Sequence, residues 1–180
     1  MRFLLLVTSI LLPMWCSVFA QTSPYAGQEE QEIKALTPSQ IEGYLTGKGM
    51  GLAKAAELNH YPGPKHVLDL AKELGLTEEQ LEKTKALFAS MKTQAIQLGQ
   101  SLVEKEKELD RLFATGEINS EQLDHILMEI GKLQAKLRYV HMKAHLDQKQ
   151  ILTPHQVALY DKLRGYGSGH LQHDSHKHLH

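Results

Sequence analysis

Apolar residues recur three and four positions apart over two long stretches of the chain, residues 81–112 and 123–151. In the first stretch only Thr84 and Lys105 interrupt the apolar stripe. This spacing places the apolar side chains on one face of a helix, so we predict two long amphipathic helices. The linking sequence ATGEINS, residues 114–120, is short and rich in turn-forming residues. The two helices should therefore fold back antiparallel.

The sequence Leu-Thr-x-x-Gln occurs three times, at residues 36–40, 76–80 and 152–156. A Thr before a helix accepts a hydrogen bond from an early backbone N–H, and a Gln three residues later reaches back to the N–H of the Thr. Each copy therefore predicts the start of a helix. A further start is expected after the turn between the long helices, with Ser120 as the candidate cap.

The remaining elements are short. We predict helices over residues 37–45 and 52–59, separated by the glycine-rich sequence TGKGMG. Residues 59–66, NHYPGPKH, form a turn on their proline and glycine content, and a helix over residues 65–74 should end at Gly75. Nothing alternates with period two, so no sheet is expected and the fold class is all-α.

The two ends of the chain lack this periodicity. Residues 1–20 have an apolar core too short to span a bilayer comfortably, which indicates a secretory signal peptide cleaved after Ala20. Residues 21–35 are predicted to be a flexible leader, and residues 167–180 a disordered, histidine-rich tail. The helical domain is then expected over residues 36–166, in a periplasmic protein whose mature chain has no transmembrane segment.

Composition narrows the function classes. The only cysteine, Cys16, lies in the signal peptide, so the mature chain has no disulfide and no thiolate ligand. Removal of Arg2 leaves 19 basic residues against 21 acidic ones, a formal charge of −2. This charge argues against nucleic acid as a partner. We find no Ser/His/Asp order, no HExxH motif and no paired catalytic carboxylates, so the protein is not expected to be an enzyme.

His141 and His145 lie four residues apart on the second long helix. This spacing puts both imidazoles on one helix face, close enough to share a metal ion. In the antiparallel hairpin His141 should lie opposite Met91, and Met91 or Met142 could serve a soft metal such as Cu(I). The alternative is two ordinary histidines on a half-exposed face, because a pair supplies only two of the usual three or four ligands.

The tail is the second candidate metal-binding segment. Neutral imidazoles bind Zn(II), Cu(II) or Ni(II) near pH 7. The alternative is a solvated polar terminus that binds metal incidentally. The cofactor, if there is one, is therefore a transition metal ion of the Zn or Cu class. The histidines concerned are His170, His173, His176, His178 and His180.

The signal peptide, the cysteine-free mature chain, the long hairpin and the LTxxQ boxes at 76–80 and 152–156 together resemble the Spy/CpxP family of periplasmic chaperones and stress-response modulators. The segments GKGMGLAKAAELNHYPGPKHVLDLAKELGLTEEQ and AHLDQKQILTPHQVALYDKLRGYG also resemble the heavy-metal-sensor branch of that family. The resemblance covers residues 36–166.

The resemblance implies a hooked antiparallel hairpin of about four helices that forms a cradle-like homodimer. The chain departs from the family pattern in two respects. Its net charge is slightly negative, whereas the client-binding face of the chaperones is positively charged. Its N-terminal part offers only His60 and His66, six residues apart, where the sensors have a pair four apart. The sensors' metal site is therefore not carried over.

Three functions follow as hypotheses. The first is a periplasmic stress protein that senses or buffers a transition metal. The second is an ATP-independent holdase chaperone that binds unfolded envelope proteins, for which exposed Phe88, Met91 or Met128 would be favourable. The third is a metal-free modulator of an envelope stress sensor, with a membrane-bound sensor protein as its partner.

Overall fold

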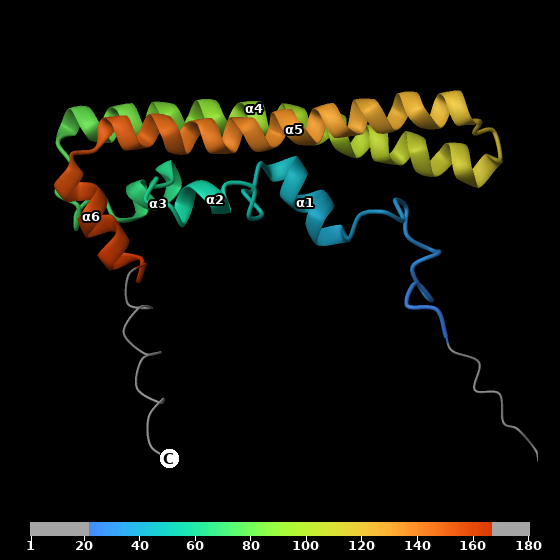
Figure 1. Ribbon diagram of the computed structural model, residues 1–180, viewed down its shortest axis with the longest axis horizontal. Helices are drawn as coiled ribbons and strands as arrows, with labels where there is room; N and C mark the ends of the chain where they lie inside the picture. Colours follow the sequence, from blue (N-terminus) through green and yellow to red (C-terminus); the bar gives the residue numbers. More distant parts are fainter. Residues whose placement is uncertain (1–21, 167–180) are drawn as a thin grey trace, which may run out of the picture. The chain divides into compact units, whose positions relative to one another are not determined.

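The computed structural model describes residues 22–166, and all regular secondary structure in this part of the chain is helical (Figure 1). The all-α prediction is therefore confirmed. By their contacts these residues fall into two compact units, and the boundary along the chain lies between Gln31 and Glu32. Residues 22–31 form turns, and residues 32–166 contain all six described helices.

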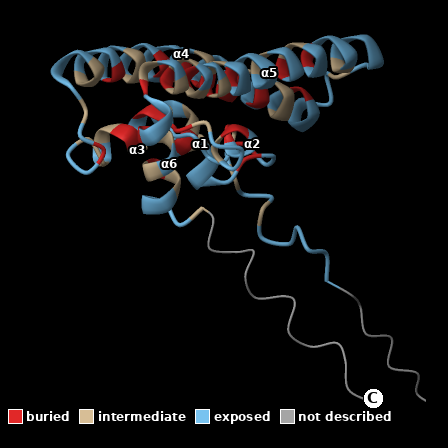
Figure 2. Cartoon of the chain, turned by 60° about the vertical axis from the view of Figure 1, so that its left-hand side comes forward, coloured by how far each residue is buried: buried red, intermediate tan, exposed pale blue. Residues whose placement is uncertain are grey.

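The two long predicted helices are present and form an antiparallel pair (Figure 1). Helix α4 spans Glu78–Thr115 and helix α5 spans Ser120–Ile151. Buried residues gather where these helices face each other and the short helices (Figure 2). Burial of this apolar seam is the main source of stability for the hairpin. The seam consists of Met91, Ala95, Leu102, Leu112, Ile126, Ile130, Leu137 and Ala144.

Four short helices complete the larger unit: α1 (Pro38–Thr46), α2 (Lys54–Glu57), α3 (Pro64–Asp69) and α6 (Pro154–Leu163). Helices α1 and α3 pack on α4, and α2 and α3 contact α5. The hooked hairpin is confirmed, but the described residues hold six helices rather than about four. The count of about four is what the family resemblance implied, whereas the sequence pattern predicted both of the short helices that lie between α1 and α4.

Helix α3 is shorter than predicted. It ends at Asp69 instead of Leu74, and residues 70–75 continue as turns before α4 begins. The turns allow Leu74 to be buried beside Tyr160 of α6 and Val67 of α3. Tertiary packing of this second core therefore outweighs the local preference for a longer helix.

The three Leu-Thr-x-x-Gln sequences each form a complete capping box, as predicted. The cap of α5 was predicted wrongly, because Asn119 and not Ser120 is its N-cap. The Asn119 side chain accepts from the N–H of Gln122, and the Gln122 side chain accepts from the N–H of Asn119. Asn119 keeps the extended backbone that a cap needs, which leaves Ser120 as the first helical residue.

The second and third boxes are joined to each other. The Gln80 amide donates to Gln156 Oε1 at 2.9 Å, and the Gln156 amide donates to Gln80 Oε1 at 3.0 Å. Gln156 also donates to the Leu74 carbonyl at 3.3 Å, and Gln80 to the Ile151 carbonyl at 2.9 Å. These bonds hold the starts of α4 and α6 together at the end of the hairpin opposite its turn.

Helix α4 has a second buried face that the sequence pattern did not predict. Gly99 meets the backbone of Tyr44 in α1, and Val103 packs with Ile33 and Leu36. The charged residue that is buried on this face is Glu106, whereas Lys105 remains partly exposed. The first long helix therefore packs on two sides, against α5 and against α1.

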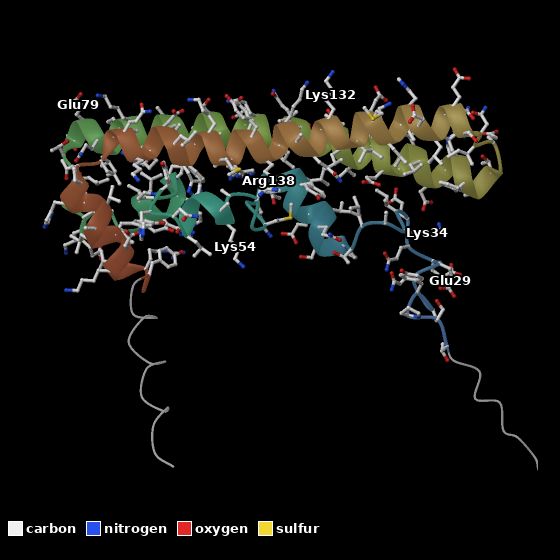
Figure 3. All side chains as sticks on the ribbon, in the orientation of Figure 1. Glu29, Lys34, Lys54, Glu79, Lys132 and Arg138 are labelled. Carbon is white, nitrogen blue, oxygen red and sulfur yellow. The ribbon has the colours of Figure 1, made fainter. Side chains whose placement is uncertain are left out.

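The opposite side of the hairpin is charged. Figure 3 shows Glu79 and Lys132 projecting from the hairpin on the side away from the short helices. No helix within residues 22–166 is long and apolar enough to cross a membrane. The predicted signal peptide, residues 1–20, and the histidine-rich tail lie outside the described residues.

Candidate metal-binding pocket

His141 and His145 lie in the wall of one cavity of about 280 Å³. Helix α5 supplies both histidines, because residues four apart face the same side of a helix. The end of α1 with the loop after it, the start of α3 and the first half of α4 supply the other walls. The pocket thus exists only where the short helices pack on the hairpin.

His145 is held by a hydrogen bond to the backbone. Its Nδ1 lies 2.7 Å from the Tyr61 carbonyl oxygen, and a carbonyl can only accept, so Nδ1 carries the proton. In the neutral ring Nε2 then keeps its lone pair. The side chain is 13% exposed and is fixed in orientation. This is the arrangement commonly found behind metal-binding histidines.

Gly63 leaves open the edge of the His145 ring that carries Nε2. A Cβ at this position would lie 2.9 Å from Cε1 and 3.1 Å from Nε2 of His145. The backbone of Gly63 is extended, with φ −84° and ψ 138°, so any residue could adopt it. The absent side chain therefore serves close approach and not backbone freedom.

A carboxylate lies behind His145. Glu57 Oε2 is 3.5 Å from Nδ1 of His145 and accepts no hydrogen bond within the described residues. Its other oxygen, Oε1, accepts from the hydroxyls of Tyr160 at 2.6 Å and Tyr166 at 2.9 Å. Arg164 Nε lies 3.5 Å from the same oxygen. A negative charge at this place strengthens His145 as an electron-pair donor.

His141 is more deeply buried, with 5% of its surface exposed. Burial, and to a lesser extent the charge of His145, lowers the pKa of His141. The ring is therefore neutral near pH 7, which is the form that binds metal ions. Its Nε2 atom is buried and has no hydrogen-bond partner within the described residues. An unpaired buried nitrogen costs free energy, and a ligand or ion would offset this cost.

Other side chains in the wall differ in character. Met91 is 8% exposed and contributes a thioether. His66 also lines the cavity, but its Nδ1 lies 3.5 Å from Asp69 Oδ2. Across residues 22–166, no group of three or more His, Cys, Asp or Glu side chains is arranged to hold a metal ion. Nitrogen and carboxylate ligands in this part of the chain therefore do not make a ready-formed three- or four-ligand site.

His60 is not part of the cavity wall. His60 pairs with Asp161 at 2.7 Å and so ties the turn before α3 to α6. The predicted tail ligands, His170 to His180, lie outside the described residues. Sequence reasoning missed Glu57 and Gly63, which have no local signal that connects them with a histidine more than 80 residues away.

No protein-family model matches the chain, and neither the curated proteins nor the solved structures contain a match to it. The resemblance to the Spy/CpxP family therefore stays a prediction from the sequence motifs.

Proposed function

We propose that this chain is an exported protein of the Spy/CpxP type that binds a transition metal ion and senses or buffers it. The observation that carries the proposal is the pair His141 and His145 in one cavity wall. His145 has its Nδ1 bonded to a carbonyl and its Nε2 edge left open by Gly63. Both features prepare an imidazole to bind metal.

The metal would stabilise the folded chain. The two histidines lie on α5, while the facing walls belong to α1, α3 and α4. An ion bound in the pocket adds a free energy of RT ln(1 + [L]/Kd) to the folded state alone. A metal-dependent increase in stability is therefore expected. The tail histidines form a second, independent set of ligands in this proposal.

The test is a calorimetric titration of residues 21–180 with Zn(II) and with Cu(II), and in the absence of oxygen with Cu(I). Three chains are compared: the unchanged sequence, one with the five tail histidines replaced by Asn, and one with His141→Ala and His145→Ala as well. We expect the second chain to bind one equivalent of metal and the third to bind none.

A matched control is His125→Ala, because His125 is 76% exposed on the same helix and its ion-pair partner among the described residues is Glu129, at 3.7 Å. It should leave binding unchanged. Equal binding by the second and third chains would place the metal outside the pocket and would overturn the proposal.

A second candidate function is a holdase chaperone, and the exposed apolar side chains of the hairpin favour it. Met128 is 69% exposed and Tyr139 is 63% exposed, whereas Met91 is buried and Phe88 is partly buried. Exposed apolar groups are the surface that unfolded clients would contact. Suppression of client aggregation that is lost in the Met128→Lys, Tyr139→Lys chain would support this function. Unchanged aggregation in the presence of the protein would leave the metal-free modulator as the alternative.

A further inference from the structure

We propose that the pocket selects a soft monovalent cation, Cu(I) or Ag(I), over divalent ions such as Zn(II), with His141, His145 and Met91 as its ligands. This inference rests on the proposed function and specifies its metal. It follows from the kinds of donor in the cavity wall, from the charges around them and from their burial.

The donor set suits a soft ion. Two imidazoles and one thioether line the same cavity, and Met91 is buried, with 8% of its surface exposed. Thioether sulfur selects Cu(I) among the biological first-row ions, and imidazole binds it as well. Divalent zinc prefers four nitrogen, thiolate or oxygen ligands, and the described residues offer it only two or three imidazoles here. Met91 therefore supplies a third ligand that suits Cu(I) but not Zn(II).

The charges in the wall also favour a single positive charge. None of the described residues that line the cavity carries a carboxylate. Three lysines line it: Lys48, Lys65 and Lys92. Lys48 and Lys65 are paired with Glu42 and Asp69 on the surface. Glu57 stands behind His145 but is shared with two phenols and lies 3.5 Å from Arg164. Repulsion from the lysines is twice as large for a divalent ion as for a monovalent one.

Burial acts in the same direction. Apolar groups of Phe88, Pro64 and Ala144 make up much of the remaining wall. An ion that enters loses part of its hydration shell, and the cost of this loss rises steeply with charge. Divalent ions recover that cost only when charged ligands neutralise them. Neutral imidazole and thioether groups are sufficient for an ion of charge one.

The test uses the chain of residues 21–180 with the five tail histidines replaced by Asn. Cu(I) and Ag(I) affinities are measured without oxygen by competition against a chromophoric Cu(I) chelator, and Zn(II) affinity by competition against a zinc indicator. We expect Cu(I) and Ag(I) to bind roughly a hundredfold or more tightly than Zn(II), as the match of soft donors to soft ions requires.

The variant Met91→Leu removes the sulfur at nearly constant volume. We expect it to weaken Cu(I) binding about tenfold or more and to change Zn(II) binding little, because only the soft ion uses the thioether. The control is Met142→Leu, since Met142 is adjacent to His141 in the sequence but is not part of the cavity wall. It should change neither affinity.

X-ray absorption at the copper edge gives a readout that does not depend on a variant. Residues 21–180 contain no cysteine, so any sulfur in the copper shell must come from methionine. We expect two nitrogen neighbours and one sulfur neighbour. A shell of nitrogen alone, or equal Cu(I) and Zn(II) affinities unaffected by Met91→Leu, would overturn this inference and leave the proposed metal pocket standing. If replacing His141 and His145 affected the binding of no metal ion, both this inference and the proposed function would be overturned.

Discussion

At the scale of single residues, Gly63 is the position at which an added methyl group would block access to the ring of His145. Gly63→Ala places a Cβ 3.1 Å from Nε2 of His145. We expect metal affinity to fall at least tenfold, on the order of what loss of a supporting contact costs, with a modest loss of stability of about 1–3 kcal/mol. Calorimetric titration and urea unfolding measure the two effects.

The control for this change is Gly49→Ala. Gly49 lines the same cavity, but a Cβ there meets nothing closer than His141 Nδ1 at 4.0 Å. It should leave metal binding nearly intact. Equal losses of affinity in both variants would mean that the pocket responds to any added volume and that the open edge of His145 has no special part.

Gly99 and Gly131 both lie inside long helices, but their surroundings are opposite. A Cβ on Gly99 would overlap the backbone carbonyl of Tyr44, whereas one on Gly131 meets nothing within 4 Å. We expect Gly99→Ala to destabilise the fold by about 1–3 kcal/mol, or more if α1 cannot move away. Gly131→Ala should stabilise it by about 0.5–1 kcal/mol, because alanine is the better helix former. Chemical denaturation of the two variants checks both signs, and destabilisation by Gly131→Ala would contradict this account.

Glu106 is a buried carboxyl group whose replacement should stabilise the protein. Burial raises the pKa of Glu106, so the folded chain holds this proton to a higher pH than the unfolded chain does. Its contribution to stability is therefore greatest below the unfolded pKa near 4.5 and falls as the pH rises through the folded pKa. Glu106→Gln should raise the free energy of unfolding at pH 7, and the gain should disappear below about pH 4.

Urea denaturation of both chains at several pH values gives this difference directly. Tyr44 is the titratable group that faces Glu106 from α1, and burial, with a smaller contribution from the charge of Glu106, raises the pKa of Tyr44. That phenol stays neutral over the whole range measured. A gain that persisted unchanged at low pH would show that the effect of Glu106→Gln is packing and not ionisation.

At the scale of elements, the three capping boxes share one sequence but differ in importance. Gln156 is buried and bonds to Gln80 and the Leu74 carbonyl, while Gln40 is exposed and bonds only within its own box. We expect Gln156→Ala to cost about 2–3 kcal/mol, because it leaves buried partners without a hydrogen bond. Gln40→Ala should cost roughly 0.5–1 kcal/mol, the value of an exposed cap. Thermal unfolding of the two variants ranks them, and equal costs would contradict the role of the Gln80–Gln156 pair.

At the scale of the whole folded unit, Glu57 connects α2, α5 and α6. Glu57→Ala removes the acceptor of two phenolic hydroxyls and the carboxylate behind His145. We expect a loss of about 2–4 kcal/mol and faster amide exchange in α6, because buried donors lose their partner. Metal affinity should also fall, by roughly tenfold, since the support of His145 is lost.

Glu79→Ala is the matched control for Glu57→Ala. Its carboxylate is 76% exposed, and its ion-pair partner among the described residues is Lys83. Little change is expected in stability, amide exchange or metal binding. Protection of α6 that survived Glu57→Ala would show that the apolar contacts of Tyr160 and Val67 hold this helix without the carboxylate.

Much of the fold was predictable because its signals are local. The period of apolar residues defines α4 and α5, and each Thr-x-x-Gln defines a helix start within four residues. The predicted end of α3 was wrong because a contact between Leu74 and α6 decided it. The cap of α5 was missed by one residue, since Asn119 and Ser120 are both good caps and only the backbone geometry distinguishes them.

The candidate site also has one part that is set by local sequence and another that is set by tertiary packing. The sequence alone determined that His141 and His145 share a helix face, because that follows from 3.6 residues per turn. Only the tertiary structure decided that this face forms a cavity wall with Met91 and that Gly63 leaves it open. It also placed Glu57 behind His145, at 3.5 Å. The physical reason is that helical periodicity acts over a few residues, whereas a pocket is formed by chain segments that meet only when their apolar faces are buried together.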